Sequence, residues 1–505
     1  MRKKLLLLSF LMICNASLFL TAQQVNTLYF MENVPVRHFL NPSFQPVTDY
    51  YVSLPVIGFT QMSVGNNSLA MKDILYNVNG QTVSFLNPQG NIPLFYNTLK
   101  SNTLIHASLQ TNLLSVGFRH ETAYWTFSLT EKADGKANLP KEVFQVALFG
   151  TPIPQNNSFD FTKLDGDVSV YTEAALGYSK QLNNKWTLGG KLKMLLGSAN
   201  ISNLNNQFVL KSGLTNWTFN GRGIANYAGP VQINVTNNYK SFSYSTPSNL
   251  SDWLKPNGVG AGIDAGFIYQ LNKRIRFSGA INDLGFIRWT GNAKNYLYKV
   301  DYTLNGIKSF SINSFGNSYQ DELNQLIQNN GLVDSIKTAF GSSINSTVTS
   351  NSYTTATTAK LNLGFEYSLV NDKISVGILS YSRLFKNILT EELTGSVNTR
   401  PLKGFNVSLS YSVVNAGFNT IGAGLGIKTG PLYWFVAADY IPFQKSTLSI
   451  TTDGTNFPKI KIPIPNNSTT FNLSTGMNII FNKKIKSGRG LVHSKRNQDC
   501  NCEWN

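Results

Sequence analysis

The stretch FNVSLSYSV, residues 405–413, alternates strictly between apolar side chains and asparagine or serine. Successive side chains of a β-strand point to opposite faces of the sheet, so this stretch has one apolar face and one polar face. It therefore predicts a β-strand that lies between an apolar and a polar environment.

The same alternation recurs along the chain from about residue 50 onward, and residues 260–271, 360–367 and 471–481 repeat it most clearly. Each such run is followed by a turn, which is typical of an all-β fold. On this pattern we predict fourteen strands. They cover residues 50–64, 104–119, 122–132, 167–180, 185–197, 259–271, 274–288, 354–368, 372–384, 389–399, 403–414, 418–428, 431–441 and 469–481.

The connections between these strands alternate in length. The tight ones are residues 120–121, 182–185, 271–274, 370–373, 399–403 and 428–431, and the long ones are 65–103, 133–166, 198–258, 289–353 and 442–468. A transmembrane β-barrel has short turns on one rim and longer loops on the other, and an even strand count returns both chain ends to one side. A soluble sandwich, the alternative, has no reason to sort its loops in this way. We therefore predict a transmembrane antiparallel β-barrel of the outer membrane.

The composition agrees with a barrel. The chain has 505 residues, of which 14% are charged and 12% are aromatic, with a net charge of +17. Disordered chains combine high charge with few aromatic residues, and helical membrane proteins carry several apolar runs of about 20 residues. Both classes are therefore excluded. Fourteen strands also leave a lumen, since about eight already suffice for side chains to fill a barrel.

The first residues predict an export signal. Basic residues at positions 2–4 precede an apolar run over residues 5–20, and we expect cleavage after Ala22. The predicted divisions are a signal peptide (1–22), an N-terminal plug or lead-in (23–49), the barrel (50–481) and a basic periplasmic tail (482–505). Once the signal is removed, only Cys500 and Cys502 remain, so no disulfide framework is expected.

Three of the long connections contain amphipathic segments. Residues 138–149 predict a short helix with Pro140 in its first turn, and residues 318–340 and 92–104 predict two more. These helices either cap the external mouth of the barrel or simply pack the loops, and both interpretations stay open.

A short motif precedes the first expected strand. Residues 39–44 read FLNPSF and, together with the barrel pattern and the export signal, resemble the FadL-like outer-membrane family and its PorV-like relatives. Those proteins typically carry Asn-Pro-Ala at this place, where this chain has Ser43 as the third residue. Residues 29–35 and 282–289 also resemble uncharacterised outer-membrane barrels. The resemblance implies an N-terminal plug and either a hydrophobic cargo or a secretion partner.

The plug is also expected from the residues themselves. Residues 23–49 show no alternation and contain apolar side chains that need cover, which the lumen offers. A periplasmic lead-in is the alternative. Phe39, Asn41 and Pro42 are the expected plug residues.

The alternation directs several charged side chains into the lumen. On a structural interpretation, these charges form a lattice of salt bridges that stiffens the wall. On a functional interpretation, the mid-strand lysines attract an anionic headgroup. The expected ligand-binding cations are Lys191, Lys193, Arg276 and Lys360, and the expected inward acids are Glu173, Asp264, Glu366 and Asp439.

One strand changes its register of alternation. Ile275, Phe277 and Ile281 share one face, whereas Leu284 and Phe286 fall on the other. A bulge or kink is therefore expected at Asn282 and Asp283, which lie between the two sets. In FadL-like barrels a wall kink opens a lateral exit into the membrane, and a bulge without a transport role is the alternative.

The sequence gives little sign of catalysis. His106 and Ser108 share a strand face, but no carboxylate stands at a matching position and no Gly-x-Ser-x-Gly elbow occurs. We expect no enzyme activity, cofactor, metal site or nucleic-acid partner. The expected partners are outer-membrane lipid and either a small hydrophobic ligand or an envelope protein. The expected function is the passage of a hydrophobic or amphipathic compound across the outer membrane, with a PorV-like scaffold for a protein partner as the alternative.

Overall fold

The computed structural model describes most of the barrel and its surroundings. The described residues are 26–78, 81–87, 90–149, 157–213, 216–236, 241–253, 255–305, 344–370, 373–385, 388–402, 404–414, 418–441, 445–450, 460–465 and 470–482. The expected signal peptide, the helix expected over 318–340 and the tail from residue 483 lie outside them.

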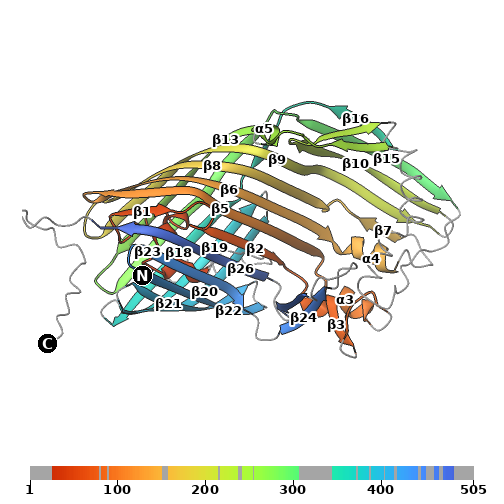
Figure 1. Ribbon diagram of the computed structural model, residues 1–505. Helices are drawn as coiled ribbons and strands as arrows, with labels where there is room; N and C mark the ends of the chain where they lie inside the picture. Colours follow the sequence, from red (N-terminus) through yellow and green to blue (C-terminus); the bar gives the residue numbers. More distant parts are fainter. Residues whose placement is uncertain are drawn as a thin grey trace, which may run out of the picture.

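Fourteen antiparallel strands close into a barrel, which confirms the predicted fold class (Figure 1). The first strand consists of two pieces, β1 and β2, and both pair with β5 on one side and with β26 on the other, so that no edge remains open. The barrel strands are β1 (Tyr50–Ser53) with β2 (Thr60–Asn66), β5 (Asn102–His120), β6 (Ala123–Pro140), β8 (Asp165–Gln181), β9 (Trp186–Ser212), β13 (Gly258–Gln270), β14 (Ile275–Trp289), β18 (Ala359–Val370), β19 (Ile374–Phe385), β20 (Ile388–Leu402), β21 (Phe405–Val414), β22 (Phe418–Thr429), β23 (Leu432–Ile441) and β26 (Thr470–Phe481).

The barrel is polar inside and apolar outside. In β21, Ser408 and Ser410 are buried, whereas Leu409 and Tyr411 between and beyond them are 57% and 48% exposed. This is the reverse of a soluble protein, and it fits strands whose outer side chains contact lipid. The stretch that predicted a strand thus also determines which face lies in the lumen.

Short turns join the strands at one end of the barrel. Asn183 and Asn272 form two of them, because each side-chain oxygen accepts hydrogen bonds from backbone N–H groups two and three residues later. Gly404 and Gly430 occupy positive φ angles at two others. We call this end, where β1 begins and β26 ends, the short-turn end.

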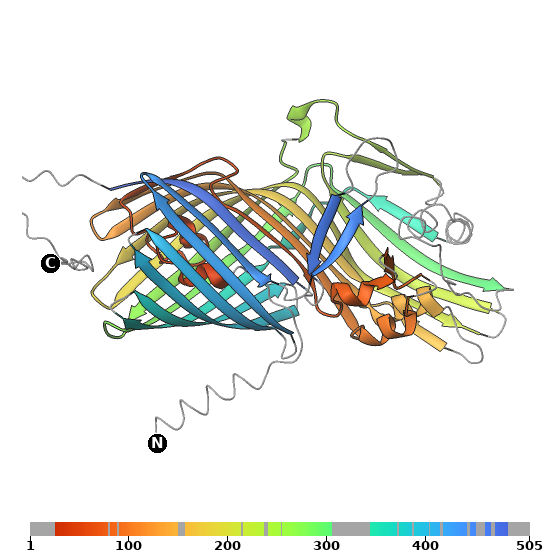
Figure 2. The same cartoon turned by 60° about the horizontal axis from the view of Figure 1, so that its bottom comes forward.

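At the opposite end, β6, β8 and β9 run beyond the barrel and carry additional strands (Figure 2). β9 was expected to end at residue 197 but continues to Ser212. A bulge at Ser198 shifts its register against β8, which breaks the alternation on which the prediction depended. The additional sheet strands are β7 (Asn157–Asp160), β10 (Asn216–Ala228), β15 (Lys294–Asn305), β16 (Ile344–Thr349) and β17 (Tyr353–Ala356).

The expected loop helices differ in their limits. One runs over α4 (Lys141–Phe149), not from residue 138, because Asn138–Pro140 still pairs with the start of β5. Another ends earlier than expected, as α3 (Ile92–Thr98), before β5 begins. No helix in the described part of the chain is long and apolar enough to cross a membrane. The remaining elements are α2 (Met71–Ile74), α5 (Leu250–Trp253), and the hairpins β3 (Leu75–Val78) with β4 (Gln81–Ser84), β11 (Gln232–Thr236) with β12 (Ser241–Ser245), and β24 (Lys445–Ile450) with β25 (Ile460–Pro465).

Candidate functional site

Residues 26–48, the N-terminal segment, lie within the barrel wall at the short-turn end (Figures 1 and 2). The segment contains two 3₁₀ turns, η1 (Asn26–Phe30) and η2 (Pro35–Phe39). Its apolar side chains form one buried cluster with lumen-facing residues of the strands, and Tyr29 at its centre is fully buried. A buried apolar cluster thus lies inside the barrel at this end.

Polar contacts tie the N-terminal segment to many strands. Thr27 donates to the carboxylate of Asp439 on β23, and Glu32 forms ion pairs with Arg276 on β14 and Arg400 on β20. The Leu40 carbonyl accepts hydrogen bonds from Asn282 on β14, at 2.7 Å, and from Asn362 on β18, at 3.0 Å. The remaining direct contacts include Asn26 to Thr394, Tyr29 to Ser278, His38 to Tyr51, and Asn41 to the Gly279 carbonyl.

Two ionisable groups of the N-terminal segment respond to this environment. Burial, together with the nearby Lys191 ammonium, holds the pKa of His38 well below its usual range, so that the imidazole is neutral. Burial alone would raise the pKa of Glu32, but the Arg276 and Arg400 guanidiniums outweigh it and hold the pKa below its usual range. Glu32 is therefore a fixed negative charge between two cations.

Asn41 and Pro42 rest directly on wall glycines. A Cβ added to Gly189 would lie 2.3 Å from the Pro42 carbonyl oxygen, and one added to Gly266 would lie 2.2 Å from Asn41 Oδ1. The segment therefore lies so close to β9 and β13 that only glycine fits beneath it.

We expect Gly189→Ala to loosen the N-terminal segment by about 1–3 kcal/mol, because the new methyl group meets backbone and not a flexible side chain. Gly190→Ala is the matched control, since its Cβ would meet an ordinary contact of 3.4 Å. Hydrogen exchange of residues 26–44 measures the effect. Equal protection in the two variants would contradict the close contact.

The wall is irregular at Asn282 and Asp283. Ile281 pairs with Ala265 and Leu284 with Ile263, so the two residues between them stand opposite the single Asp264. Asp283 has a φ of 59°, which few non-glycine residues adopt. On its other side β14 changes partner here, from β18 to β17.

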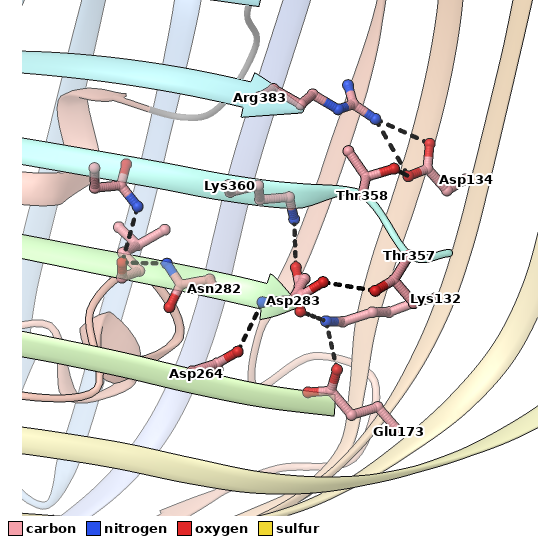
Figure 3. Close-up of polar contacts among 12 residues, drawn as sticks. Lys132, Asp134, Glu173, Asp264, Asn282, Asp283, Thr357, Thr358, Lys360 and Arg383 are labelled. Atoms are coloured by element: carbon pink, nitrogen blue, oxygen red, sulfur yellow. Dashed lines mark hydrogen bonds and ion pairs between the residues drawn. The ribbon is translucent and has the colours of Figure 1, made fainter. Parts of the chain in front are cut away.

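Three lysines converge on the Asp283 carboxylate. Figure 3 shows two of them, Lys132 and Lys360. The Nζ atoms of Lys132 and Lys193 lie 2.8 and 2.7 Å from Oδ1, and that of Lys360 lies 2.9 Å from Oδ2. Glu173 and Asp264 complete this group, the Asp283 cluster: Glu173 pairs with Lys132 at 2.7 Å and Asp264 with Lys193 at 2.7 Å. The two neighbouring residues of this bulge therefore have different partners. Asn282 binds the N-terminal segment, and Asp283 binds the lysines of the charged cluster.

A small cavity lies between this cluster and the N-terminal segment. Its volume is about 50 Å³, which is room for a few water molecules and not for a large ligand. Phe39 and Leu40 line it from the segment, and Lys132, Asp283 and Lys360 line it from the wall. A second ion pair, Arg383 with Asp134 at 2.9 Å, also borders it.

The structure separates the four cations that were expected to bind a ligand. Lys193 and Lys360 both join the Asp283 cluster. Arg276 instead pairs with Glu32 and Glu366, and Lys191 lies over the Phe39 ring, with Nζ 4.5 Å from the ring centroid. Only two of the four therefore share a site.

Sequence reasoning did not single out Lys132, Asp134 or Arg383. Lys132 stood at the last position of its expected strand, and Asp134 lay beyond it. Charged residues at every second position, 132, 134 and 136, were the available signal that β6 continues with a polar lumen face.

Comparison with known proteins shows one family and several barrels of similar fold. Residues 42–439 match the family described as "Family of unknown function (DUF5723)". The toluene transporter TodX of Pseudomonas putida is 10% identical with a TM-score of 0.39, over 92% of this chain and 97% of that one. A FadL homologue of Pseudomonas aeruginosa is 11% identical with a TM-score of 0.35, over 91% and 98%.

The translocator domain of the autotransporter NalP from Neisseria meningitidis is 9% identical, with a TM-score of 0.24, over 86% of this chain and 88% of that one. No curated protein sequence matches the chain. The two FadL-type barrels agree with the resemblance stated from the sequence. At these identities and TM-scores the likenesses concern the barrel fold, and they carry no argument about function.

Proposed function

We propose that this chain, which belongs to the family of unknown function DUF5723, passes a small hydrophobic compound across the outer membrane. Export through a signal peptide over residues 1–22 is part of the proposal. The observation that supports it best is the N-terminal segment, whose buried apolar core fills the lumen at the short-turn end. An apolar cluster at this place opposes a continuous path for water, so the barrel suits a hydrophobic compound more than a water-soluble one.

The contacts at the wall support the same proposal. Asn282 binds the Leu40 carbonyl of the N-terminal segment, and its neighbour Asp283 binds three lysines beside the cavity. A movement of the N-terminal segment would therefore change the contacts at the irregular part of the wall. Coupling of this kind lets arrival of a compound at the segment change the wall.

The native chain is expected to increase uptake of the uncharged fluorescent probe N-phenyl-1-naphthylamine several-fold in intact cells, compared with cells that lack it. Liposomes that contain it should not swell in glucose, because the N-terminal segment places a buried apolar cluster in the lumen. The opposite pattern, glucose passage without probe uptake, would show a hydrophilic pore and contradict the proposal.

The scaffold alternative depended on the tail after residue 482 and on the connection 289–353. The tail from 483 and residues 306–343 lie outside the described residues, and in the described part β15 pairs with β10 on one side and with β16 on the other. No observation on the described residues favours a protein partner, so transport is the function proposed.

A further inference from the structure

Outward-facing aromatic side chains form a belt on part of the barrel near the short-turn end. Six neighbouring strands, β6, β8, β9, β13, β14 and β18, contribute Trp125, Tyr178, Trp186, Tyr269, Phe277 and Phe365. The rings of Trp125 and Tyr178 lie 4.6 Å apart between centroids, and so do those of Trp186 and Tyr269. Such girdles lie at the membrane–water interface of transmembrane barrels. The belt therefore marks the depth of the lipid headgroups on this side.

Basic side chains follow directly beyond the belt, toward the turns. Lys180 lies two residues past the aromatic residue of β8 and on the same face, and Lys185 directly precedes the aromatic residue of β9. Lys273 and Arg274 lie in the turn between β13 and β14. All four side chains are exposed. We call these four residues the basic arc.

Backbone pairing places the members of the basic arc along one stretch of the rim. Lys180 lies where β8 pairs with β9. The Lys185 carbonyl accepts a hydrogen bond of 2.7 Å from the N–H of Gln270, the last residue of β13, and the turn with Lys273 follows from there. The Arg274 carbonyl in turn accepts one of 2.8 Å from the backbone of β18. The four cations therefore follow consecutive strands from β8 to β14.

The basic arc carries an excess of positive charge. Arg119, at the same end, is paired with Asp49 at 3.3 Å, and Arg400 is paired with Glu32. Within the part of the chain that the structure describes, the four side chains of the arc form no ion pair of this kind. The turn before β6 adds one exposed acid, Glu121, against four cations. Anionic groups from outside the chain are thus the natural partners of the arc.

The position of the basic arc favours lipid over a soluble partner. Lys180 continues the lipid-facing side of β8, and Lys185 adjoins the ring of Trp186, which is 39% exposed. Long basic side chains at this depth keep their stems on apolar surface while their charges reach the headgroups. A protein that approached from the periplasm would meet the tips of the turns, whereas these two lysines lie beside the membrane surface.

We propose that the basic arc binds the phosphate groups of anionic phospholipids, so that the barrel selects these lipids at its short-turn end. Ammonium and guanidinium groups form charge-assisted hydrogen bonds with phosphate, and the rings of the belt pack against the lipid below its headgroup. The inference goes beyond the proposed function and does not depend on it, because it concerns the lipid around the barrel and not the content of the lumen.

Native mass spectrometry of the full chain tests the selection. The protein is incubated with equal amounts of phosphatidylglycerol, which is anionic, and phosphatidylethanolamine, which carries no net charge. Each basic side chain near an anionic lipid surface strengthens binding about fivefold, so we expect the native chain to retain phosphatidylglycerol at least tenfold more. Equal retention of the two lipids would overturn the proposal.

A variant with all four cations of the basic arc replaced by glutamine should lose this preference. The matched control carries the same change at three lysines and one arginine on the strands at the opposite end, Lys211, Arg222, Lys294 and Lys299. The control should keep the native preference. An equal loss in both variants would mean that net charge alone attracts the lipid, and it would overturn the site. Heat-modifiable migration in gels establishes that each variant is folded.

A measurement on the chain with its charges intact locates the lipid. Brominated phosphatidylglycerol in bilayers should quench tryptophan fluorescence more than brominated phosphatidylethanolamine, and Trp186→Phe should remove at least half of the difference. Trp434→Phe is the matched control, because Trp434 is exposed on β23 and lies outside the belt. A difference that is lost in Trp434→Phe and kept in Trp186→Phe would place the lipid elsewhere and overturn the proposal.

A soluble headgroup separates lipid from free phosphate. Glycerol 1-phosphate carries the phosphate without acyl chains, so at the same concentration it should leave the retained phosphatidylglycerol unchanged. Displacement of the lipid by this compound would show a site for free phosphate and overturn the assignment to phospholipid.

Discussion

Replacing Asp283 by alanine is expected to destabilise the barrel by about 3–5 kcal/mol, because three lysines are then left to share the two remaining carboxylates of the cluster, Glu173 and Asp264. Lys132 and Lys193 are 9% and 4% exposed at their side chains, and each lies within 2.8 Å of this carboxylate. Lys360 has Asp283 as its ion-pair partner at 2.9 Å. Urea unfolding of the barrel in detergent, followed by tryptophan fluorescence, measures the loss.

A double variant separates the charge effect from the loss of the side chain. Lys360→Met removes the ammonium group but keeps an apolar chain of similar length, so Asp283→Ala with Lys360→Met should be less destabilised than the sum of the two single variants. Coupling between contacting residues is commonly about 0.5–3 kcal/mol. Strict additivity would show that the cluster does not depend on this pair.

Asp283→Asn is the conservative comparison. Asparagine tolerates a positive φ as aspartate does, so the bulge conformation is kept while the charge is removed. We expect a loss smaller than that of Asp283→Ala, since the amide oxygen still accepts a hydrogen bond from a lysine. A loss equal to that of alanine would mean that charge alone determines the effect.

Replacing Tyr29 by alanine is expected to release the N-terminal segment from the lumen. Tyr29 is fully buried, and its ring meets those of Phe30 and Phe44 at centroid distances of 5.1 and 5.0 Å. Truncating a buried aromatic residue costs about 3–5 kcal/mol. The strands keep their own backbone ladders, so we expect the loss to fall on the docking of the segment and not on the barrel.

Two measurements follow Tyr29→Ala. Hydrogen exchange of residues 26–44 should accelerate, and the barrel should begin to conduct ions across a planar bilayer. Tyr29→Phe keeps the ring but loses the hydroxyl contact with Ser278 at 3.0 Å, which is worth about 1 kcal/mol, so it should remain closed. A Tyr29→Ala variant that exchanges rapidly but does not conduct would show that the N-terminal segment is not what closes the lumen.

The sequence predicted the barrel strands because alternation is a local property. Each strand places its own polar residues in the lumen, as Ser408 and Ser410 do, whatever its neighbours are. The prediction was weakest where a bulge breaks the alternation. It ended β9 at residue 197, one residue before the bulge at Ser198, although the strand continues to Ser212.

The charged site was only partly predictable. Alternation places Lys193, Asp264 and Lys360 in the lumen, but it does not predict which of them form ion pairs. The pairing depends on the stagger between strands that are far apart in the chain. Lys132 and Asp283 are 151 positions apart and hydrogen-bonded at 2.8 Å. Arg276, on the same strand as Asp283, pairs instead with Glu32 of the N-terminal segment.

The sequence by itself determined the number of barrel strands, the sorting of short and long connections, and the side of each barrel strand that faces lipid. These follow from period-two patterning and from turn residues, which act over a few positions. The tertiary structure alone decided that residues 26–48 pack against the inner side of the strands and that three lysines share Asp283. Those features exist only once the barrel closes, because closure brings the first and last strands together around one interior.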